Sequence, residues 1–414
     1  MLKLQHWYFD PAQSMITIFI HVFIIVIALV YFQPDRPMRF YYWSGALIKV
    51  MAGLILGWLY WKLGEGDTLT FHQKALELYQ LFFTDYWQEL FTAHNPVFKS
   101  EARTELFTKI LSALYWTNGG NYWISATYLS LLSFAGAWQI IRQIRKYEAW
   151  LVLPAVIAFL WLPSAVFWTS GVLKDSLIAG ALFYLMAVMI QYYCENKFSI
   201  FQYLLVGLSL LILFYLKFYL LATIGLSMGI LAWWQLLQKL DLSLQLRWTF
   251  TFGFVIIMGL LVTQLNMNLH LDKLPQAIFD NYHSIAHQSE TGTFITFDNL
   301  KPNWTSLSLH LSLGLWAGIS RPYLWEVNWM LVIPATEHVI FILLLAFTFY
   351  KRAIPKHPLL WIGIFYCFIL ATFLPLVAPN FGSLIRYEAA YTSLLLFLLL
   401  IPVFQSKLLK AKSN

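Results

Sequence analysis

The sequence predicts an all-α fold, a polytopic integral membrane bundle of about 11 transmembrane helices. Composition is the first observation: 60% of the 414 residues are hydrophobic and 11% are charged, with a mean hydropathy of +0.64. Soluble domains are about 45–50% apolar and about 25% charged. The 27 basic and 20 acidic side chains cannot cover the surface of a 48.3 kDa chain, so much of that surface must face lipid. This balance excludes soluble, fibrous and disordered proteins.

The spacing of the apolar runs is the second observation. Crossing a hydrocarbon core of about 30 Å takes roughly 17–25 residues. The run 200–237 is too long for one helix and has Lys217 at its centre, which predicts two spans with a turn at Lys217. The predicted spans are 15–32, 41–60, 121–140, 150–168, 176–194, the two within 200–237, 248–266, 328–350, 358–377 and 387–404.

Loop charge is the third observation, and it sets the orientation. If the Lys-rich C-terminus is cytoplasmic, that side holds 14 of the 27 Lys and Arg but only four of the 20 acids, Asp35, Glu148, Glu195 and Asp241. This distribution is typical of cytoplasmic loops. The N-terminus is then outside, and residues 1–414 form a single transmembrane domain with two long extracytoplasmic loops, 61–120 and 267–327. No stretch is large enough for a nucleic-acid-binding module, despite the net charge of +7.

Both long loops contain predicted helices. Residues 72–92 interleave aromatic and apolar side chains with charged ones, which favours a helix in the membrane interface. Residues 100–115 repeat apolar side chains at helical spacing after a capping Ser100. Residues 304–319 are mildly apolar and are consistent with a re-entrant or interfacial helix or with a twelfth span.

Acidic candidates follow the second span, in the segment 64–72. Its glycines let the backbone turn near a ligand, and Glu65, Asp67 and His72 lie where membrane gives way to water. An acid at that depth is suited to act as a general base or to position a metal. The alternative is a solvated helix end at which Asp67 caps the next helix.

Four cations at predicted outer junctions form the second group of candidates. They are Lys174, Lys217, Arg321 and Arg386. A cation near hydrocarbon costs about 2.5–3.5 kcal/mol, so four on one side favour a shared anionic ligand such as a polyprenyl phosphate. The alternative is local pairing of Lys174 with Asp175, Arg321 with Glu326, and Arg386 with Glu388.

Metal binding is not predicted. His283 and His287 are four residues apart but have no Cys or acid at ligand spacing, which favours a solvated loop. The sequence identifies no cofactor, and a divalent cation beside the outer acid stays an open alternative.

Several segments together resemble a known group of enzymes. The acid Asp67 in the first outer loop, the junction PSAVFWTSGVLKDS at 163–176, RPYLWE at 321–326 and RYE at 386–388 before a Leu-rich last span are similar to bacterial GT-C-type membrane glycosyltransferases and O-antigen-type polymerases. The resemblance implies a bacterial inner-membrane protein of surface-glycan assembly that uses a lipid-phosphate sugar.

The resemblance also implies roles for the candidate residues. Asp67, with Glu65 as the second acid, would act as base or metal partner. The four cations would hold the lipid phosphate, and the flanking polar residues of the binding site would be His72, Asp175 and Glu326.

The predicted function is transfer of a sugar from a polyprenyl-phosphate-linked donor at the periplasmic face. One alternative is a polysaccharide polymerase or ligase, in which arginines hold a diphosphate and no acid is essential. The other is a lipid or solute transporter or flippase, which should carry charges at mid-membrane; Lys49 and Glu337 are the candidates for that position. The oligomeric state is open.

Overall fold

The computed structural model describes residues 11–64, 66–95, 100–195, 197–265, 270–289, 292–353 and 357–411. In these ranges the chain is helical, and strand-like pairing is confined to one bridge between Phe294 and Asn380. The chain divides into two compact units. Unit 1 comprises Met1–Phe134 and Ser170–Ser176, and unit 2 comprises Ala135–Thr169 and Leu177–Asn414.

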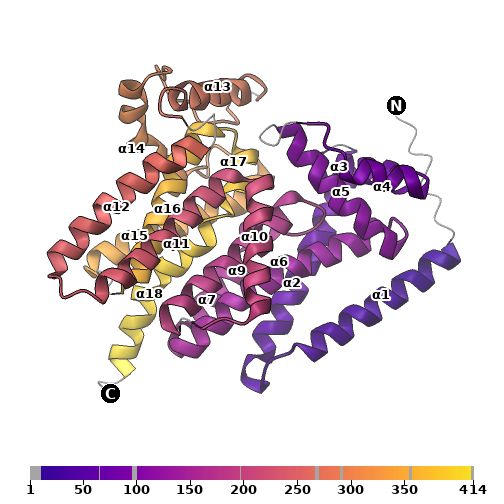
Figure 1. The fold of residues 1–414 in the computed structure, drawn as a ribbon, viewed down its shortest axis with the longest axis horizontal. Helices are drawn as coiled ribbons and strands as arrows, with labels where there is room; N and C mark the ends of the chain where they lie inside the picture. Colours follow the sequence, from indigo (N-terminus) through magenta and orange to yellow (C-terminus); the bar gives the residue numbers. More distant parts are fainter. Residues whose placement is uncertain are drawn as a thin grey trace. The chain divides into compact units, whose positions relative to one another are not determined.

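Unit 1 is built from the first helices of the chain (Figure 1). They are α1 (Pro11–Tyr31), α2 (Arg36–Leu63), α3 (Asp67–Tyr79), α4 (Phe83–Phe91), α5 (Ser100–Asn118) and the first half of α6 (Tyr122–Tyr147). Helix α2 ends because Gly64 adopts a left-handed conformation at φ 75°. Helix α3 packs against α5, where the Phe71 and Phe107 rings meet edge to face at 5.1 Å.

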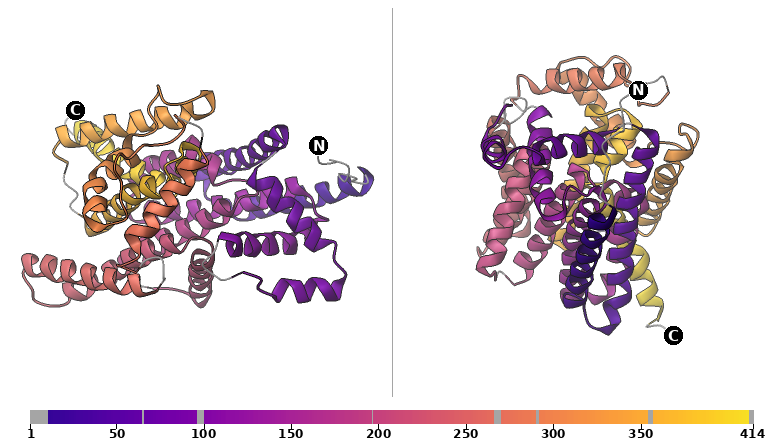
Figure 2. Two further views of the ribbon diagram at one scale, coloured as in Figure 1. Left: turned by 90° about the horizontal axis from the view of Figure 1, so that it is seen from above. Right: turned by 90° about the vertical axis from the view of Figure 1, so that its right-hand side faces the viewer.

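Unit 2 contains the second half of α6, most of α9 and the remaining helices (Figure 2). These are η1 (Ala149–Leu151), α7 (Val152–Leu160), α8 (Pro163–Trp168), α9 (Lys174–Cys194), α10 (Ile200–Leu216), α11 (Phe218–Gln238), α12 (Leu244–Leu265), α13 (Leu274–His287), α14 (Trp304–Ser320), η3 (Trp329–Leu331), α15 (Val332–Tyr350), α16 (Pro358–Val377), α17 (Phe381–Glu388) and α18 (Thr392–Ala411). The predicted turn at Lys217 is confirmed: this residue lies between α10 and α11 in non-helical backbone.

Seven helices of the described part of the chain are long and apolar enough to cross a membrane. An eighth span results if α17 and α18, which meet at 62°, are counted as one. A multi-pass helical membrane protein is therefore supported, whereas the total of 11 stays a prediction. The difference lies in three apolar segments that are shorter: Met15–Tyr31 of α1, α10, and the segment of η1 and α7.

Two predicted helices are broken in the structure. The predicted span 150–168 is interrupted at Trp161 and Leu162, because Pro163 starts a separate helix, α8. The predicted interface helix 72–92 is interrupted at 80–82, between α3 and α4. By contrast, the helix predicted over 100–115 is confirmed as α5.

The second long loop is also largely helical. It contains α13 and α14, and α14 begins after Asn303, whose side chain accepts a hydrogen bond from the Ser306 N–H at 2.8 Å. Between these helices, residues 293–295 hydrogen-bond to the backbone at 379–381, just before α17. The Ile295 N–H donates to Pro379 O at 3.0 Å, and the Phe381 N–H donates to Thr293 O at 3.0 Å. This pairing fixes the start of α17.

Helices α14 and α16 pack at backbone contact distance. A Cβ added to Gly314 would lie 2.4 Å from Thr372 O, and one added to Gly318 would lie 2.2 Å from Ala371 O. Small residues of this kind let membrane helices approach closely. The α14–α16 pair therefore forms a rigid part of unit 2.

Candidate functional site

Unit 2 contains a buried cluster of ionisable and hydroxyl side chains. Glu337 and His338 lie on α15, Glu388 is the last residue of α17, and Ser164 lies on α8. Tyr391 follows α17 in the turn before α18. All five side chains are buried. Such residues inside membrane-spanning helices are costly and are typical of functional sites.

Glu337 binds the beginning of α8 through both of its carboxylate oxygens. The Ser164 N–H donates to Oε1 at 2.9 Å, and the Ser164 hydroxyl donates to Oε2. The first N–H groups of a helix have no partner within the helix, and a carboxylate there also interacts favourably with the helix dipole. Glu337 is therefore held by a short helix that lies 173 positions away in the sequence.

His338 and Glu388 form a buried pair at ion-pair distance. The His338 Nδ1–H donates to Pro334 O at 3.0 Å, so Nε2 is the nitrogen that faces Glu388. Nε2 lies 3.3 Å from Glu388 Oε2, at ion-pair distance rather than in an aligned hydrogen bond. Without a proton between them, two lone pairs would face each other in a buried site, so the pair carries one proton on Nε2 or Oε2.

Tyr391 links this pair to α14. Its hydroxyl donates to Gly318 O at 2.5 Å and lies 3.2 Å from Glu388 Oε1. A phenol has one proton to donate. Because Gly318 O is nearer than Glu388 Oε1, the Tyr391 proton is directed at Gly318 O. The cluster thus joins α8, α14, α15 and the α17–α18 turn.

Two predicted cations lie close to this cluster. Arg386 is two residues before Glu388 on α17 and is half-buried. The Lys217 ammonium lies 4.3 Å from the centre of the Tyr387 ring, in a cation–π contact, and Lys217 itself is buried. Lys217 therefore contacts the residue that lies between Arg386 and Glu388 on α17.

The third cation of unit 2 is paired locally. Arg321 follows the end of α14, and its guanidinium lies 3.1 Å from Glu326 and 5.0 Å from the centre of the Tyr323 ring. Glu326 also accepts a hydrogen bond from the Tyr323 N–H at 3.0 Å. The local pairing of Arg321 with Glu326, one of the two alternatives from the sequence, is confirmed.

The other predicted site residues belong to unit 1. Asp67 is the first residue of α3 and is exposed, whereas Glu65 lies outside the described residues. The Lys174 ammonium donates to Thr104 Oγ1 at 3.2 Å and lies 4.9 Å from the centre of the Phe71 ring. Asp175 is buried. The predicted set is thus divided between the two units.

His72 has a structural environment in unit 1. It is buried, with Nδ1 2.5 Å from the Tyr115 hydroxyl and its ring edge-on to Tyr115 and Tyr122. Burial lowers the pKa of His72 to about 4, so the imidazole is neutral at pH 7. A neutral imidazole enclosed by tyrosines stabilises the α3–α5 packing.

Metal ligands are not gathered in the described part of the chain: no group of three His, Cys, Asp or Glu side chains there is arranged to hold an ion. His283 and His287 lie on α13, so the predicted loop is wrong and the segment is a helix, although both side chains are exposed. His283 packs on Phe279, with ring centres 4.2 Å apart.

Sequence reasoning did not assign roles to His338, Glu388 or Ser164. The sequence does contain a signal for His338, because ATEHVIF at 335–341 places two ionisable residues inside an apolar segment. Glu388 was considered only as a local partner of Arg386, and no sequence pattern indicates its contact with His338, 50 positions away.

The chain was compared with known proteins. No protein-family model matches it, and neither a curated protein nor a solved structure matches it.

Proposed function

We propose that this protein is a membrane glycosyltransferase that transfers a sugar from a polyprenyl-phosphate-linked donor during surface-glycan assembly, at the periplasmic face of a bacterial inner membrane. The observation that carries the proposal is the contact of Lys217 with Tyr387, the residue next to Arg386 on α17, in a bent helix pair that can form one membrane span. Two cations at such a position suit a phosphate whose lipid tail stays in the bilayer.

The proposed reaction is a displacement at the anomeric carbon of the donor sugar. The acceptor oxygen forms a bond to that carbon as the bond to the phosphate oxygen breaks. The products are the glycoside and the polyprenyl phosphate, and the hydroxyl proton of the acceptor passes to a carboxylate. Lys217 and Arg386 stabilise the negative charge that develops on the departing phosphate.

Asp67 of unit 1 is the proton acceptor proposed from the sequence, and this role is a separate proposal from the phosphate contacts of unit 2. Asp67 is an exposed carboxylate at the first turn of α3, where water and an acceptor hydroxyl can reach it. Glu388 is enclosed by His338 and Tyr391 and is not proposed to meet the substrate.

Lipid binding tests the phosphate site directly. Native mass spectrometry of the full chain would compare undecaprenyl phosphate with the uncharged alcohol undecaprenol. The wild type should prefer the phosphate, and the double variant Lys217→Ala/Arg386→Ala should lose most of that preference. Lys239→Ala is the matched control, because Lys239 lies at the C-terminal end of α11 and Lys217 at its N-terminal end. Equal binding of the two lipids by the wild type would refute the phosphate site.

Proton-coupled transport is the second candidate function. The shared proton of His338 and Glu388, next to a helix interrupted by a 62° bend, favours it, because transporter sites lie at broken helices. Proton flux into proteoliposomes under an imposed membrane potential would distinguish the two functions. A flux that is abolished in Glu388→Gln and preserved in Glu77→Gln, at an exposed position of α3, would support transport. The absence of flux from the wild type would exclude it.

A further inference from the structure

Helix α4 in unit 1 has three chemically different sides. Tyr86 and Glu89 are directed toward α5 and the following loop. Thr84, Asp85 and Gln88 form an exposed polar side. The third side is aromatic and exposed, since Phe83, Trp87 and Phe91 recur every four residues and so share one side of the helix.

The aromatic side extends beyond the helix into a continuous strip. We use the name aromatic strip for Phe82, Phe83, Trp87, Phe91 and Trp116, whose exposed fractions range from 43% to 83%. The rings contact one another in series: Trp116 and Phe83 at 6.1 Å, Phe83 and Trp87 at 5.9 Å, and Trp87 and Phe91 stacked at 6.0 Å. Exposed apolar patches of this kind mark sites of interaction.

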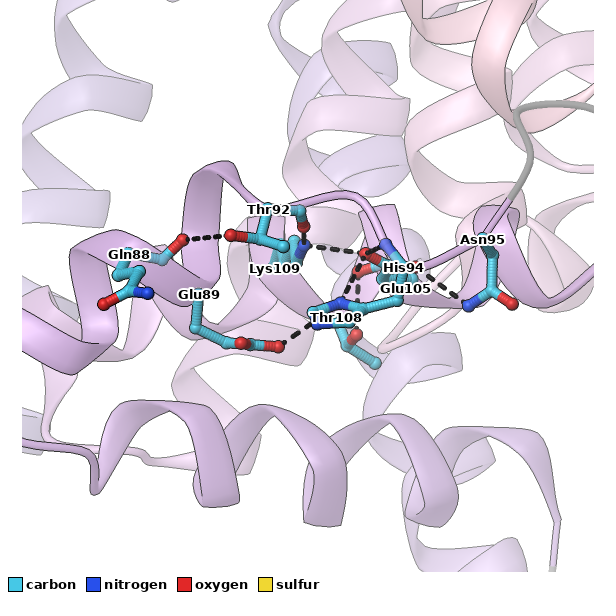
Figure 3. Close-up of polar contacts among 8 residues, drawn as sticks. All are labelled: Gln88, Glu89, Thr92, His94, Asn95, Glu105, Thr108 and Lys109. Atoms are coloured by element: carbon cyan, nitrogen blue, oxygen red, sulfur yellow. Dashed lines mark hydrogen bonds and ion pairs between the residues drawn. The ribbon is translucent and has the colours of Figure 1, made fainter.

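Polar contacts fix α4 and its following segment to α5 (Figure 3). Glu105 of α5 accepts hydrogen bonds from Lys109 at 2.8 Å, from Asn95 Nδ2 at 2.9 Å and from the His94 N–H at 3.1 Å. Lys109 also donates to Thr92 O. The aromatic strip is therefore presented on a rigid support and is not a loose loop.

We infer that the aromatic strip is a membrane-interface anchor that binds the headgroup–acyl boundary of the bilayer. The occupant is identified by three features together. The chain has helices able to span a membrane, and one of them, α2, leads into α3 and α4 through a tight turn at Gly64. Trp and Phe are the residues typical of that boundary. The polar side of α4, next to the aromatic side, gives the helix one side for lipid and one for water.

The anchor differs from the single interface helix predicted over 72–92. In α3, Phe71, His72 and Ala75 are buried by the protein itself, so that helix has no comparable apolar side facing outward. The lipid-facing surface belongs to α4 and to Trp116 of α5. Through α5, the anchor also sets the position of Thr104, the residue that holds Lys174.

Spin-label accessibility tests the anchor without reference to any activity. Phe91→Cys and Asp85→Cys would each be labelled in a Cys194→Ser/Cys367→Ala background of the full chain, in phospholipid nanodiscs. Both positions are exposed, so the labels do not disturb packing. Collisions with oxygen, which partitions into lipid, would be compared with collisions with a water-soluble nickel chelate.

Opposite behaviour at the two positions is the expected result. The label at 91 should collide several-fold more with oxygen than the label at 85, and the label at 85 several-fold more with the nickel chelate. Strong nickel collisions at both positions would place α4 in water and overturn the anchor. Shielding of position 91 from both reagents would show a protein partner instead, and would overturn it as well. Unchanged size-exclusion and circular dichroism profiles confirm that each labelled variant is folded.

Discussion

His338 Nε2 lies 3.3 Å from Glu388 Oε2 in the interior of unit 2, where both side chains are almost completely buried. Their helices, α15 and α17, are separated in the chain by the whole of α16. The pair holds one proton and is electrically neutral as a unit. Removing either side chain would leave the other without its compensating partner in a region of low dielectric constant.

Replacing His338 should therefore be strongly destabilising. His338→Ala leaves Glu388 buried without the imidazole, and breaking a buried pair in this way costs about 3–5 kcal/mol. Glu388→Gln should cost much less, because the glutamine amide can donate to Nε2. Unfolding of the detergent-solubilised protein, followed by intrinsic fluorescence, measures both. His283→Ala, on the exposed side of α13, is the control. Equal effects of the two histidine substitutions would contradict the proton-sharing pair.

Asp67→Asn should abolish sugar transfer while leaving the amount of folded protein unchanged, because Asp67 is exposed and its amide is nearly isosteric. Transfer of radiolabelled sugar to acceptor by membranes containing each variant is the measurement. Asp85→Asn, another exposed acid of unit 1, should retain full activity. Retained activity in Asp67→Asn would favour the polymerase or ligase alternative, in which no acid is essential.

Acid should loosen the attachment of α4 to α5 through Glu105. Burial alone would raise the pKa of this carboxyl, but hydrogen bonds from Lys109, Asn95 and the His94 N–H outweigh it and lower the pKa to about 2. A lowered pKa stabilises the folded state above the unfolded value of 4.5, and this contribution is lost as pH falls from there through 2. Hydrogen exchange of peptides from 83–109 should quicken over that range, and less so in Glu105→Gln, which lacks the titration.

His72 should add a second acid-sensitive step at higher pH. Its folded pKa of about 4 lies below the model-compound value of 6.5, so below pH 6.5 the unfolded chain takes up the proton first. Protection of the α3–α5 amides should therefore begin to fall below pH 6.5 and keep falling to about pH 4. His72→Phe should remove this step, whereas His287→Phe, at the end of α13, should leave it in place. An unchanged pH profile in His72→Phe would show that another group is responsible.

Gly318→Ala should destabilise unit 2, because the new Cβ would lie 2.2 Å from the Ala371 carbonyl oxygen and would force α14 and α16 apart. Gly225→Ala in α11 is a matched control: nothing lies within 4 Å of its Cβ position, and helix propensity predicts a gain of up to about 1 kcal/mol. Thermal unfolding in detergent compares the two. A loss of stability that is no greater for Gly318→Ala than for Gly225→Ala would contradict the close helix contact.

The sequence predicted local features well and long-range ones poorly. The break at Lys217 and the helix over 100–115 follow from side chains that act on their own neighbours, and both are confirmed. The interruption at 161–162 was missed, because a run of apolar residues does not reveal where a proline starts a new helix. A lone cation such as Arg386 is also a local feature, because it stands out in the hydropathy profile of an apolar segment.

The buried cluster could not be predicted in the same way. Its contacts join residues that are far apart in the chain, such as Ser164 and Glu337. A buried acid is tolerated only when tertiary packing supplies its hydrogen bonds, and no local pattern records which distant helix will do so. The close helix contacts at Gly314 and Gly318 could not be predicted either, since their partners are carbonyl groups of another helix.

The carbonyl contacts of Gly314 and Gly318 also restrict how this protein can move. Two helices in register at this distance cannot slide along each other without driving backbone atoms together, so α14 and α16 must travel as one body. Any opening and closing during a working cycle is then left to joints with looser backbone, such as the non-helical Lys217 between α10 and α11 and the bend between α17 and α18.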